Sequence, residues 1–173
     1  MKHLLTCFLL IYMSLAFGQE TVEQYVREGI GYHDAGDFQS AIEAYQHALY
    51  LNPNSSLANY EIAMTFSAMN AHDSAMKYTN KVLELDDGSL LPAYIIKGNT
   101  LDATGHPDEA LEVYETALKN IGENYLLHYN MGLTQYKVKR YADAQNSLIT
   151  AILINSGHTS SHLILGNLMQ ELN

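Results

Sequence analysis

Two histidines have the spacing of a metal-binding pair and are the first place to look for chemistry. His158 and His162 are four residues apart, which can place two imidazole ligands on one face of a helix. No carboxylate motif accompanies them, and His158 falls in an expected loop rather than on the helix that would carry His162. We therefore expect no metal site at this pair.

The chain also lacks the glycine-rich loops that hold phosphates or nucleotides. Gly29-Ile30-Gly31 has neither the third glycine nor the preceding strand of a dinucleotide-binding fingerprint, and no P-loop occurs. Acidic residues gather on stretches expected to form outer helices, where a solvated face is the usual explanation. This group comprises Glu43, Asp108, Glu109, Glu112, Glu115 and Asp143. We expect no catalytic residue, no cofactor and no small-molecule substrate, so the chain is not predicted to be an enzyme.

The elements that would position these residues are revealed by small residues that recur every 34 or 35 positions. Three rows share this spacing: Gly29, Ala63, Gly98, Gly132 and Gly166; Ala41, Ala75, Ala110 and Ala144; Ala48, Val82, Ala117 and Ala151. Two helices approach to about 8–10 Å where small side chains lie at the contact. Such a period indicates one supersecondary unit repeated as a stack, because a single helical hairpin cannot bury its apolar face.

The first unit shows the two helices of such a hairpin. Apolar residues at three- and four-residue steps predict helices over residues 22–34 and 38–51. Gly36 lies between them and suits the left-handed conformation that ends a helix. The equivalent turn contains Gly105 in the third unit, whereas Met69-Asn70-Ala71 and Val138-Lys139-Arg140 stand there in the second and fourth.

The first unit resembles the tetratricopeptide repeat in the pattern Tyr25-x2-Glu28-Gly29-x2-Tyr32-x8-Ala41-x3-Tyr45-x2-Ala48-x4-Pro53. The resemblance covers residues 22–173 and implies an all-α, right-handed superhelical solenoid of helix-turn-helix repeats. It divides the chain into repeats at 22–55, 56–90, 91–124 and 125–158, with 159–173 as the first helix of an incomplete fifth repeat or a capping helix. His128 and His162 occupy equivalent positions and are expected to replace the first aromatic residue of the repeat.

The resemblance also implies where a partner would bind, because the first helices of such repeats line a concave groove that accepts an extended peptide or a helix. Mapping the repeats onto this chain places these side chains on that surface: Val26, Ile30, Tyr60, Met64, Ile95, Asn99, Tyr129, Leu133 and Tyr136. Aromatic anchors in an apolar patch commonly carry binding energy. The competing interpretation is that Tyr60 and Tyr129 in particular pack between adjacent repeats.

The last predicted helix, within residues 159–173, is unusually apolar for the end of a repeat array. Terminal helices need a polar outer face, yet Glu171 is the only charged residue here. The apolar residues expected to form a C-terminal interface are Leu163, Leu165, Leu168, Met169 and Leu172. Self-association, cover by another partner, or continuation in a longer protein would each account for them.

The N-terminus has the organisation of a signal peptide over residues 1–18. A basic start at Lys2 precedes an apolar run from Leu4 to Leu15, and small residues precede an expected cleavage before Gln19. The apolar run is shorter than the roughly 20 residues that span a bilayer. Removal of the leader would also remove Cys7, the only cysteine. We expect an exported protein, most naturally periplasmic, with secretion or surface attachment as alternatives.

The charge balance limits the choice of partner. The chain carries 9 basic and 19 acidic residues, a formal net charge of −10. Nucleic acid and anionic lipid surfaces both favour basic proteins, so neither is expected, and any membrane association would be indirect. The sequence therefore predicts a non-enzymatic scaffold or adaptor that binds a protein or peptide. The alternatives are a self-associating structural element and the sensory or interaction region of a longer envelope protein.

Overall fold

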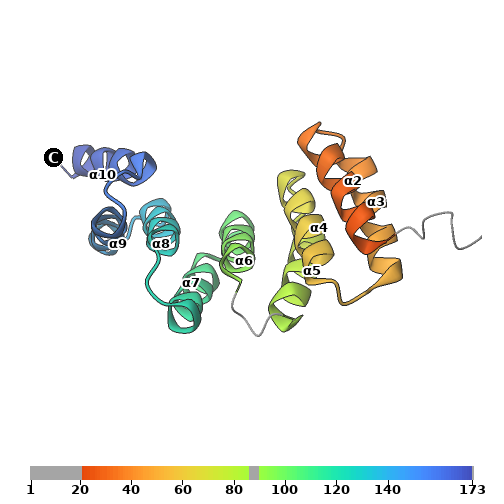
Figure 1. The fold of residues 1–173 in the computed structure, drawn as a ribbon. Coiled ribbons are helices and arrows are strands. Elements are labelled where there is room, and N and C mark those ends of the chain that lie inside the picture. Colours follow the sequence, from red (N-terminus) through yellow and green to blue (C-terminus); the bar gives the residue numbers. More distant parts are fainter. Residues whose placement is uncertain (1–20, 86–89, 173) are drawn as a thin grey trace, which may run out of the picture. The chain divides into compact units, whose positions relative to one another are not determined.

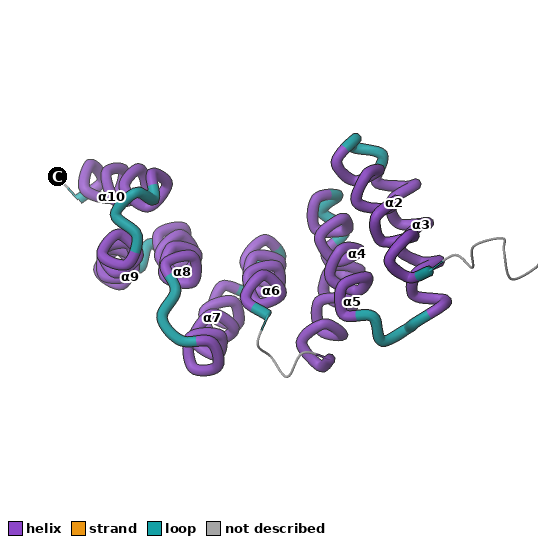
Figure 2. The backbone as a smooth tube through the Cα atoms, in the orientation of Figure 1, coloured by secondary structure: helices purple, strands orange, loops and turns teal. Residues whose placement is uncertain are grey.

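The computed structural model describes residues 21–85 and 90–172, and every regular element in these ranges is an α-helix (Figures 1 and 2). The predicted signal peptide lies outside the described residues. The chain divides into two compact units, which are described separately: an N-terminal unit up to Ser55 and a C-terminal unit from Ser56 onward.

The N-terminal unit is one helical hairpin, formed by α2 (Val22–Asp34) and α3 (Phe38–Leu51), and both predicted helices are confirmed. Thr21 caps α2 through a reciprocal capping box with Gln24: the Gln24 N–H donates to Thr21 Oγ1 at 3.2 Å, and the Thr21 N–H donates to Gln24 Oε1 at 2.8 Å. These bonds satisfy donors that the first turn of a helix leaves without intrahelical partners. The start of the array is therefore set locally by the sequence.

The C-terminal unit contains three hairpins and a further helix, which follow one another in chain order (Figure 1). The hairpins are α4 (Ser56–Ala68) with α5 (His72–Leu85), α6 (Leu91–Ala103) with α7 (Pro107–Ile121), and α8 (Tyr125–Lys137) with α9 (Tyr141–Ile154), followed by α10 (Thr159–Glu171). Each helix packs on the next, and the first helices also contact one another in the order α4, α6, α8, α10. This arrangement gives the C-terminal unit a continuous layer of first helices.

The turns inside the four hairpins share one geometry. In each turn the N–H of the residue immediately before the second helix donates at 2.9 Å to the carbonyl oxygen five residues earlier. Asp37, for example, donates to Tyr32 in this way. This hydrogen bond is the 6→1 bond of a Schellman motif. The residue before that donor has a positive φ in every case: Gly36 at 78°, Asn70 at 55°, Gly105 at 83° and Lys139 at 62°. The less typical turns at Asn70 and Lys139 thus adopt the same left-handed conformation as the glycine turns.

Three glycines of the recurring row, Gly29, Gly98 and Gly132, lie in close contact with the second helix of their hairpins. A β-carbon added at Gly98 would lie inside van der Waals contact of the Tyr114 ring, 2.7 Å from the phenol oxygen, and one added at Gly132 would lie 2.8 Å from Leu148 Cγ. Gly29 meets Tyr45 in the same way. Absence of a side chain is therefore what allows the large residue of the second helix to cross the first helix.

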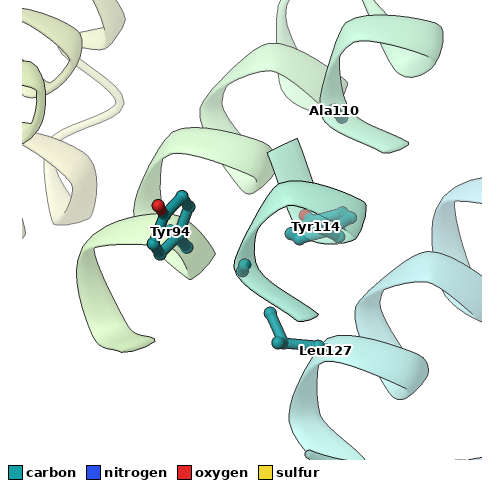
Figure 3. Close-up of a cluster of buried hydrophobic side chains, with 5 residues drawn as sticks. Tyr94, Ala110, Tyr114 and Leu127 are labelled. Atoms are coloured by element: carbon teal, nitrogen blue, oxygen red, sulfur yellow. The ribbon is translucent and has the colours of Figure 1, made fainter. Parts of the chain in front are cut away.

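A buried cluster joins α6, α7 and α8 in the middle of the C-terminal unit (Figure 3). Tyr94 comes from α6, Ala110 and Tyr114 from α7, and Leu127 from α8. Tyr114, Ala110 and Leu127 are each fully buried. The core is therefore shared between one hairpin and the next, as expected when a single hairpin cannot bury its own apolar face.

Candidate protein-interaction surfaces

The first helices of the C-terminal unit present a row of partly exposed side chains, which we name the first-helix surface. Its members are Tyr60 and Met64 of α4, Ile95 and Asn99 of α6, and Tyr129, Leu133 and Tyr136 of α8. Residues four apart on one helix lie on the same face. Since α4, α6 and α8 contact one another in order, the sequence-predicted pairs lie on consecutive helices of one layer.

Asn99 is exposed, but its amide also serves the core. The Tyr114 hydroxyl donates a hydrogen bond to Asn99 Oδ1 at 2.8 Å, so the ring that crosses Gly98 ends on the first-helix surface. Burial and the nearby carboxylate of Asp102 both raise the pKa of Tyr114, which therefore keeps its proton as a donor. Asn99 retains its amide nitrogen for another contact.

Tyr129 fits the interpretation that aromatic residues pack between repeats. Its ring lies edge-on to the His158 ring, with centroids 4.8 Å apart and planes at 80°. Tyr125 also packs edge-on against the His158 ring, with ring centroids 5.0 Å apart. The His158 imidazole thus links α8 to the segment that leads into α10, and Tyr129 is only partly available to a partner.

Tyr60 remains at the surface in a partly desolvated environment. Its side chain is half-buried, and this burial is the main cause that raises its pKa, with the charge of Glu61 as a smaller cause. A tyrosine of this kind presents a large apolar body and a hydroxyl that keeps its proton. Both features suit an anchor residue at a protein interface.

Tyr136 is engaged by the last helix. Its hydroxyl donates to Glu171 Oε1 at 2.6 Å, while the Tyr141 hydroxyl donates to Oε2 of the same carboxylate at 2.7 Å. These two hydrogen bonds are the largest causes that hold the pKa of Glu171 below its ordinary value. The only charge of α10 is thus turned toward α8 and α9, which anchors the C-terminal turn of that helix.

The two predicted residues of α2 differ in their availability. Ile30 is half-buried, but Val26 is 2% exposed, so its assignment to a partner surface is wrong. Val26 precedes Gly29 by three residues and shares its helix face, where α3 packs closely. Its side chain belongs to the core of the N-terminal unit.

The predicted C-terminal interface also divides into buried and exposed residues. Leu163, Met169 and Leu172 are 62%, 43% and 53% exposed, whereas Leu165 is half-buried. Leu168 is fully buried, so it cannot belong to an open interface. Its place on α10 is two turns after the buried Ser161, and this shared face seats α10 on α8 and α9.

His158 and His162, the pair with metal-ligand spacing, each contact oxygen atoms of nearby serines. His158 Nδ1 lies 2.8 Å from Ser161 Oγ, and His162 Nε2 lies 2.9 Å from the Ser156 carbonyl oxygen. Within residues 21–85 and 90–172, no group of three or more histidine, cysteine or acidic side chains could hold a metal ion. The two imidazoles position the turn before α10.

Sequence reasoning missed two hollows on the molecule. One, of about 490 Å³, is lined by Met76 of α5, by Tyr94, Lys97 and Leu101 of α6, and by Glu109, Glu112, Val113 and Thr116 of α7. The other, of about 310 Å³, lies in the N-terminal unit and is lined by Tyr25, Glu28, Tyr32, Ser40, Glu43, Ala44 and His47. Glu43, Glu109 and Glu112 were assigned to a solvated face, and helix periodicity alone does not show that a neighbouring helix leaves space beside them.

The sequence analysis also missed the polar contacts between repeats. Lys137 Nζ lies 2.5 Å from Asp102 Oδ2 and links α8 to α6, while Arg140 Nη2 lies 2.7 Å from Asp108 Oδ1 at the start of α7. The partners are 35 and 32 residues apart in the chain. A search for opposite charges about one repeat apart in the sequence could have found them.

None of the helices in the described ranges has the length and apolar character that crossing a membrane requires.

This combination of stacked hairpins, glycine contacts and shared turns defines a helical-repeat protein that offers surfaces to other proteins. Profiles of the tetratricopeptide repeat match residues 22–55, 57–88 and 97–158. The chain belongs to the tetratricopeptide-repeat family, and its fold is an all-α solenoid of that family.

Individual proteins show the same likeness. The chain is 30% identical over 129 residues to small glutamine-rich tetratricopeptide repeat-containing protein 2 of Mycosarcoma maydis. That alignment covers 75% of this chain and 36% of the relative. The crystal structure of MamA aligns with a TM-score of 0.75 at 22% identity and covers 87% of this chain and 82% of that one. PilF of Pseudomonas aeruginosa aligns with a TM-score of 0.77 at 22% identity, with coverages of 87% and 68%.

The curated relatives are much longer than the matched region. The chain spans 36%, 24% and 26% of the lengths of three of them. Membership in the family supports the role of a protein-interaction scaffold, and the structural likenesses at this level of identity establish the fold.

Proposed function

We propose that this protein is an exported, non-enzymatic adaptor that binds a peptide or a helix of another protein on its first-helix surface. The observation that carries the proposal is the row of partly exposed apolar and aromatic side chains on consecutive first helices, with Tyr60 and Met64 on α4 and Leu133 on α8. Such residues form the energetic centre of many protein interfaces.

The chemistry of this surface suits an apolar ligand that also offers hydrogen bonds. Tyr60 keeps its hydroxyl proton, and Asn99 has an amide nitrogen beside the oxygen that Tyr114 occupies. A ligand would bury its side chains against Met64, Ile95 and Leu133 and would hydrogen-bond to Tyr60 and Asn99. A periodic array of first helices favours a ligand that contacts several repeats in turn, because each repeat adds a similar strip of surface.

Photocrosslinking in the native cell tests this role. A benzophenone side chain at Tyr60 should capture a distinct protein, and the same group at Lys119, which is exposed on the second helix α7, is the matched control. We expect capture at position 60 and weaker or no capture at position 119. Equal capture at the two positions would contradict a binding role of the first-helix surface.

A binding measurement with the captured partner then separates binding from folding. Tyr60→Ala should weaken the affinity by about tenfold or more if Tyr60 is an anchor, with an unchanged helical circular dichroism spectrum. Unchanged affinity in a folded variant would remove Tyr60 from the site.

Export has its own test. The proposed leader covers residues 1–18, so mature protein recovered from the periplasm should begin at Gln19, as measured by intact mass. A variant that lacks residues 2–18 should remain inside the cell. Recovery of full-length protein in the cytoplasm with no processed form would exclude the exported location and leave the interaction surface unaffected.

A further inference from the structure

The hollow of about 490 Å³ that α5, α6 and α7 line belongs to the middle of the C-terminal unit, and we name it the α6 hollow. Part of its lining is apolar and half-buried, from Met76, Leu101 and Val113. Glu109 and Glu112 of α7 line it as well and are exposed. A ligand in this hollow would therefore meet an apolar surface beside two carboxylates.

The charged groups of the α6 hollow have no ionic partner in the described part of the chain. Lys97, Glu109 and Glu112 take part in none of the ion pairs within residues 21–85 and 90–172. Neighbouring carboxylates of α6 and α7 are instead engaged by cations of the next repeat; these pairs are Asp102 with Lys137 and Asp108 with Arg140. The two glutamates of the hollow thus offer their charge to a cation from outside the chain.

Lys97 occupies a place that apolar residues take in the neighbouring repeats. Ile62 is the equivalent residue of α4 and is fully buried, and Met131 of α8 packs against the buried cluster that contains Tyr114. Lys97 is only half-buried and lines the hollow. A lysine here gives up packing that isoleucine or methionine would provide. Departures of this kind from a repeat pattern are expected at functional sites.

Tyr94 contributes a buried hydroxyl to the same hollow (Figure 3). It is 6% exposed, and its oxygen accepts a hydrogen bond from the Asn120 amide nitrogen at 2.7 Å. Among the described residues, the hydroxyl proton of Tyr94 has no acceptor. A buried donor without an acceptor costs free energy, which a bound carbonyl oxygen would recover. Tyr94 is therefore a second feature, independent of the glutamates, that indicates a ligand.

The antiparallel course of α6 and α7 sets the order of these groups along the hollow. The hydrogen bond from Asn120 to Tyr94 shows that the end of α7 lies beside the start of α6. Leu101 and Glu109 accordingly lie toward the other end, where the two helices are joined. Two turns of helix separate the ends, or about 10 Å. An extended arginine or lysine residue has a comparable length from its carbonyl oxygen to its cationic head.

We propose that the α6 hollow binds the side chain of an arginine or lysine in an extended segment of a partner protein. The aliphatic stem lies on the apolar side chains, and the cationic head meets Glu109 and Glu112. A main-chain carbonyl oxygen of the segment accepts hydrogen bonds from the Tyr94 hydroxyl and the Lys97 ammonium group. With one lysine and two glutamates the lining has a net charge of −1, and the whole chain has one of −10. Both charges favour a cationic partner.

The α6 hollow is separate from the first-helix surface of the proposed function. Tyr94, Lys97 and Leu101 follow at three- and four-residue steps and share one face of α6. Ile95 and Asn99 of the first-helix surface are offset from them and lie on another face. Binding at one surface does not require the other, so the two proposals can fail independently.

A methyl NMR titration of the full chain tests the proposal. Isotope-labelled methionine methyl groups report on Met76 in the lining, and the signal is assigned by its loss in Met76→Leu. The probe is acetyl-glycyl-arginyl-glycine amide, and the control peptide carries citrulline, which keeps the shape of arginine without its charge. We expect a saturable shift with a dissociation constant of about 5 mM or tighter for the arginine peptide. The citrulline peptide should bind at least about threefold more weakly.

Protein variants locate the site. Glu112→Gln should weaken binding of the arginine peptide about threefold or more. Glu115→Gln is the matched control, because Glu115 is also exposed on α7 but does not line the hollow, and it should bind as the parent does. Both variants replace an exposed carboxylate by an amide of the same size, so folding should be unaffected, and circular dichroism verifies this. Tyr60→Ala should leave the titration unchanged.

Three results would overturn the proposal. These are a shift of the Met76 methyl signal that does not saturate up to about 20 mM arginine peptide, equal binding of the arginine and citrulline peptides, and equal effects of Glu112→Gln and Glu115→Gln. The last result would assign the binding to a general attraction of cations by the acidic surface of α7.

Discussion

Gly98→Ala is the substitution whose outcome the structure determines most sharply. The added methyl group would overlap the ring of Tyr114, which is fully buried and cannot move into solvent. The ring would have to shift, and its hydrogen bond to Asn99 would lengthen or break. One methyl group thus disturbs both the packing of α6 on α7 and a polar contact at the first-helix surface.

The expected magnitude follows from three contributions. Overpacking a close-packed contact costs about 1–3 kcal/mol, and loss of the Tyr114 hydrogen bond costs about 1 kcal/mol. Replacement of a helical glycine by alanine returns about 1 kcal/mol through helix propensity. The net destabilisation is therefore about 1–3 kcal/mol, even though alanine is the better helix former.

Gly166→Ala is the matched control, because Gly166 occupies the same repeat position and no side chain of the described residues covers it. It should be neutral or stabilise α10 by up to about 1 kcal/mol. Urea unfolding followed at 222 nm compares the two variants with the parent. If Gly98→Ala is as stable as the parent, or if both variants shift in the same direction by the same amount, the account of glycine as a steric requirement at this contact is refuted.

Three further predictions rest on single contacts. Lys139→Gly should stabilise the protein by about 0.5–1 kcal/mol in urea unfolding, because Lys139 has a φ of 62° that glycine adopts without strain. Destabilisation by this substitution would contradict the assignment of strain to the turn. Ser147→Ala should lower the free energy of unfolding by about 1–3 kcal/mol in the same assay. Ser147 Oγ donates to the buried Gln135 Oε1 at 2.8 Å, and the substitution would leave that oxygen without its donor. A neutral effect would show that Gln135 Oε1 finds another donor. The pKa of Glu171 is lowered in the folded state, so its contribution to stability is complete above the unfolded-state value near 4.5 and is lost as the pH falls through the lower folded value. The protection of α10 amides against hydrogen exchange, relative to their intrinsic exchange rates at each pH, should therefore fall in that range. Glu171→Gln should abolish this pH dependence, and an unchanged profile in that variant would contradict the assignment.

The sequence predicted the hairpins because their signals are local. The first two helices match their predicted bounds, and the left-handed turn at Gly36 follows from residue type. Lys139 and Asn70 were harder to place, since neither residue requires a positive φ. Their turns form because the preceding and following helices impose the same pair of backbone hydrogen bonds in all four hairpins.

The surfaces were predictable only in part, because exposure depends on neighbouring helices. Position in the repeat brought Met64, Asn99 and Leu133 to one layer, but it gave no warning that Val26 is buried. Contacts such as that between Tyr136 and Glu171 join residues 35 positions apart, and no local pattern indicates them. The periodicity of the array therefore predicts which helix face a residue occupies, and the identity of the next repeat decides whether that face stays open.

The first-helix surface can discriminate among ligands because its chemistry changes along the layer. Asn99 takes a place that Met64 and Leu133 occupy in the neighbouring repeats. A ligand that offers a polar group opposite Asn99 and apolar groups on either side would match this surface, whereas a uniformly apolar ligand would leave the Asn99 amide nitrogen without a partner. Substitutions at Asn99 should therefore change which ligand is preferred, and substitutions at Met64 or Leu133 should reduce affinity for all ligands alike.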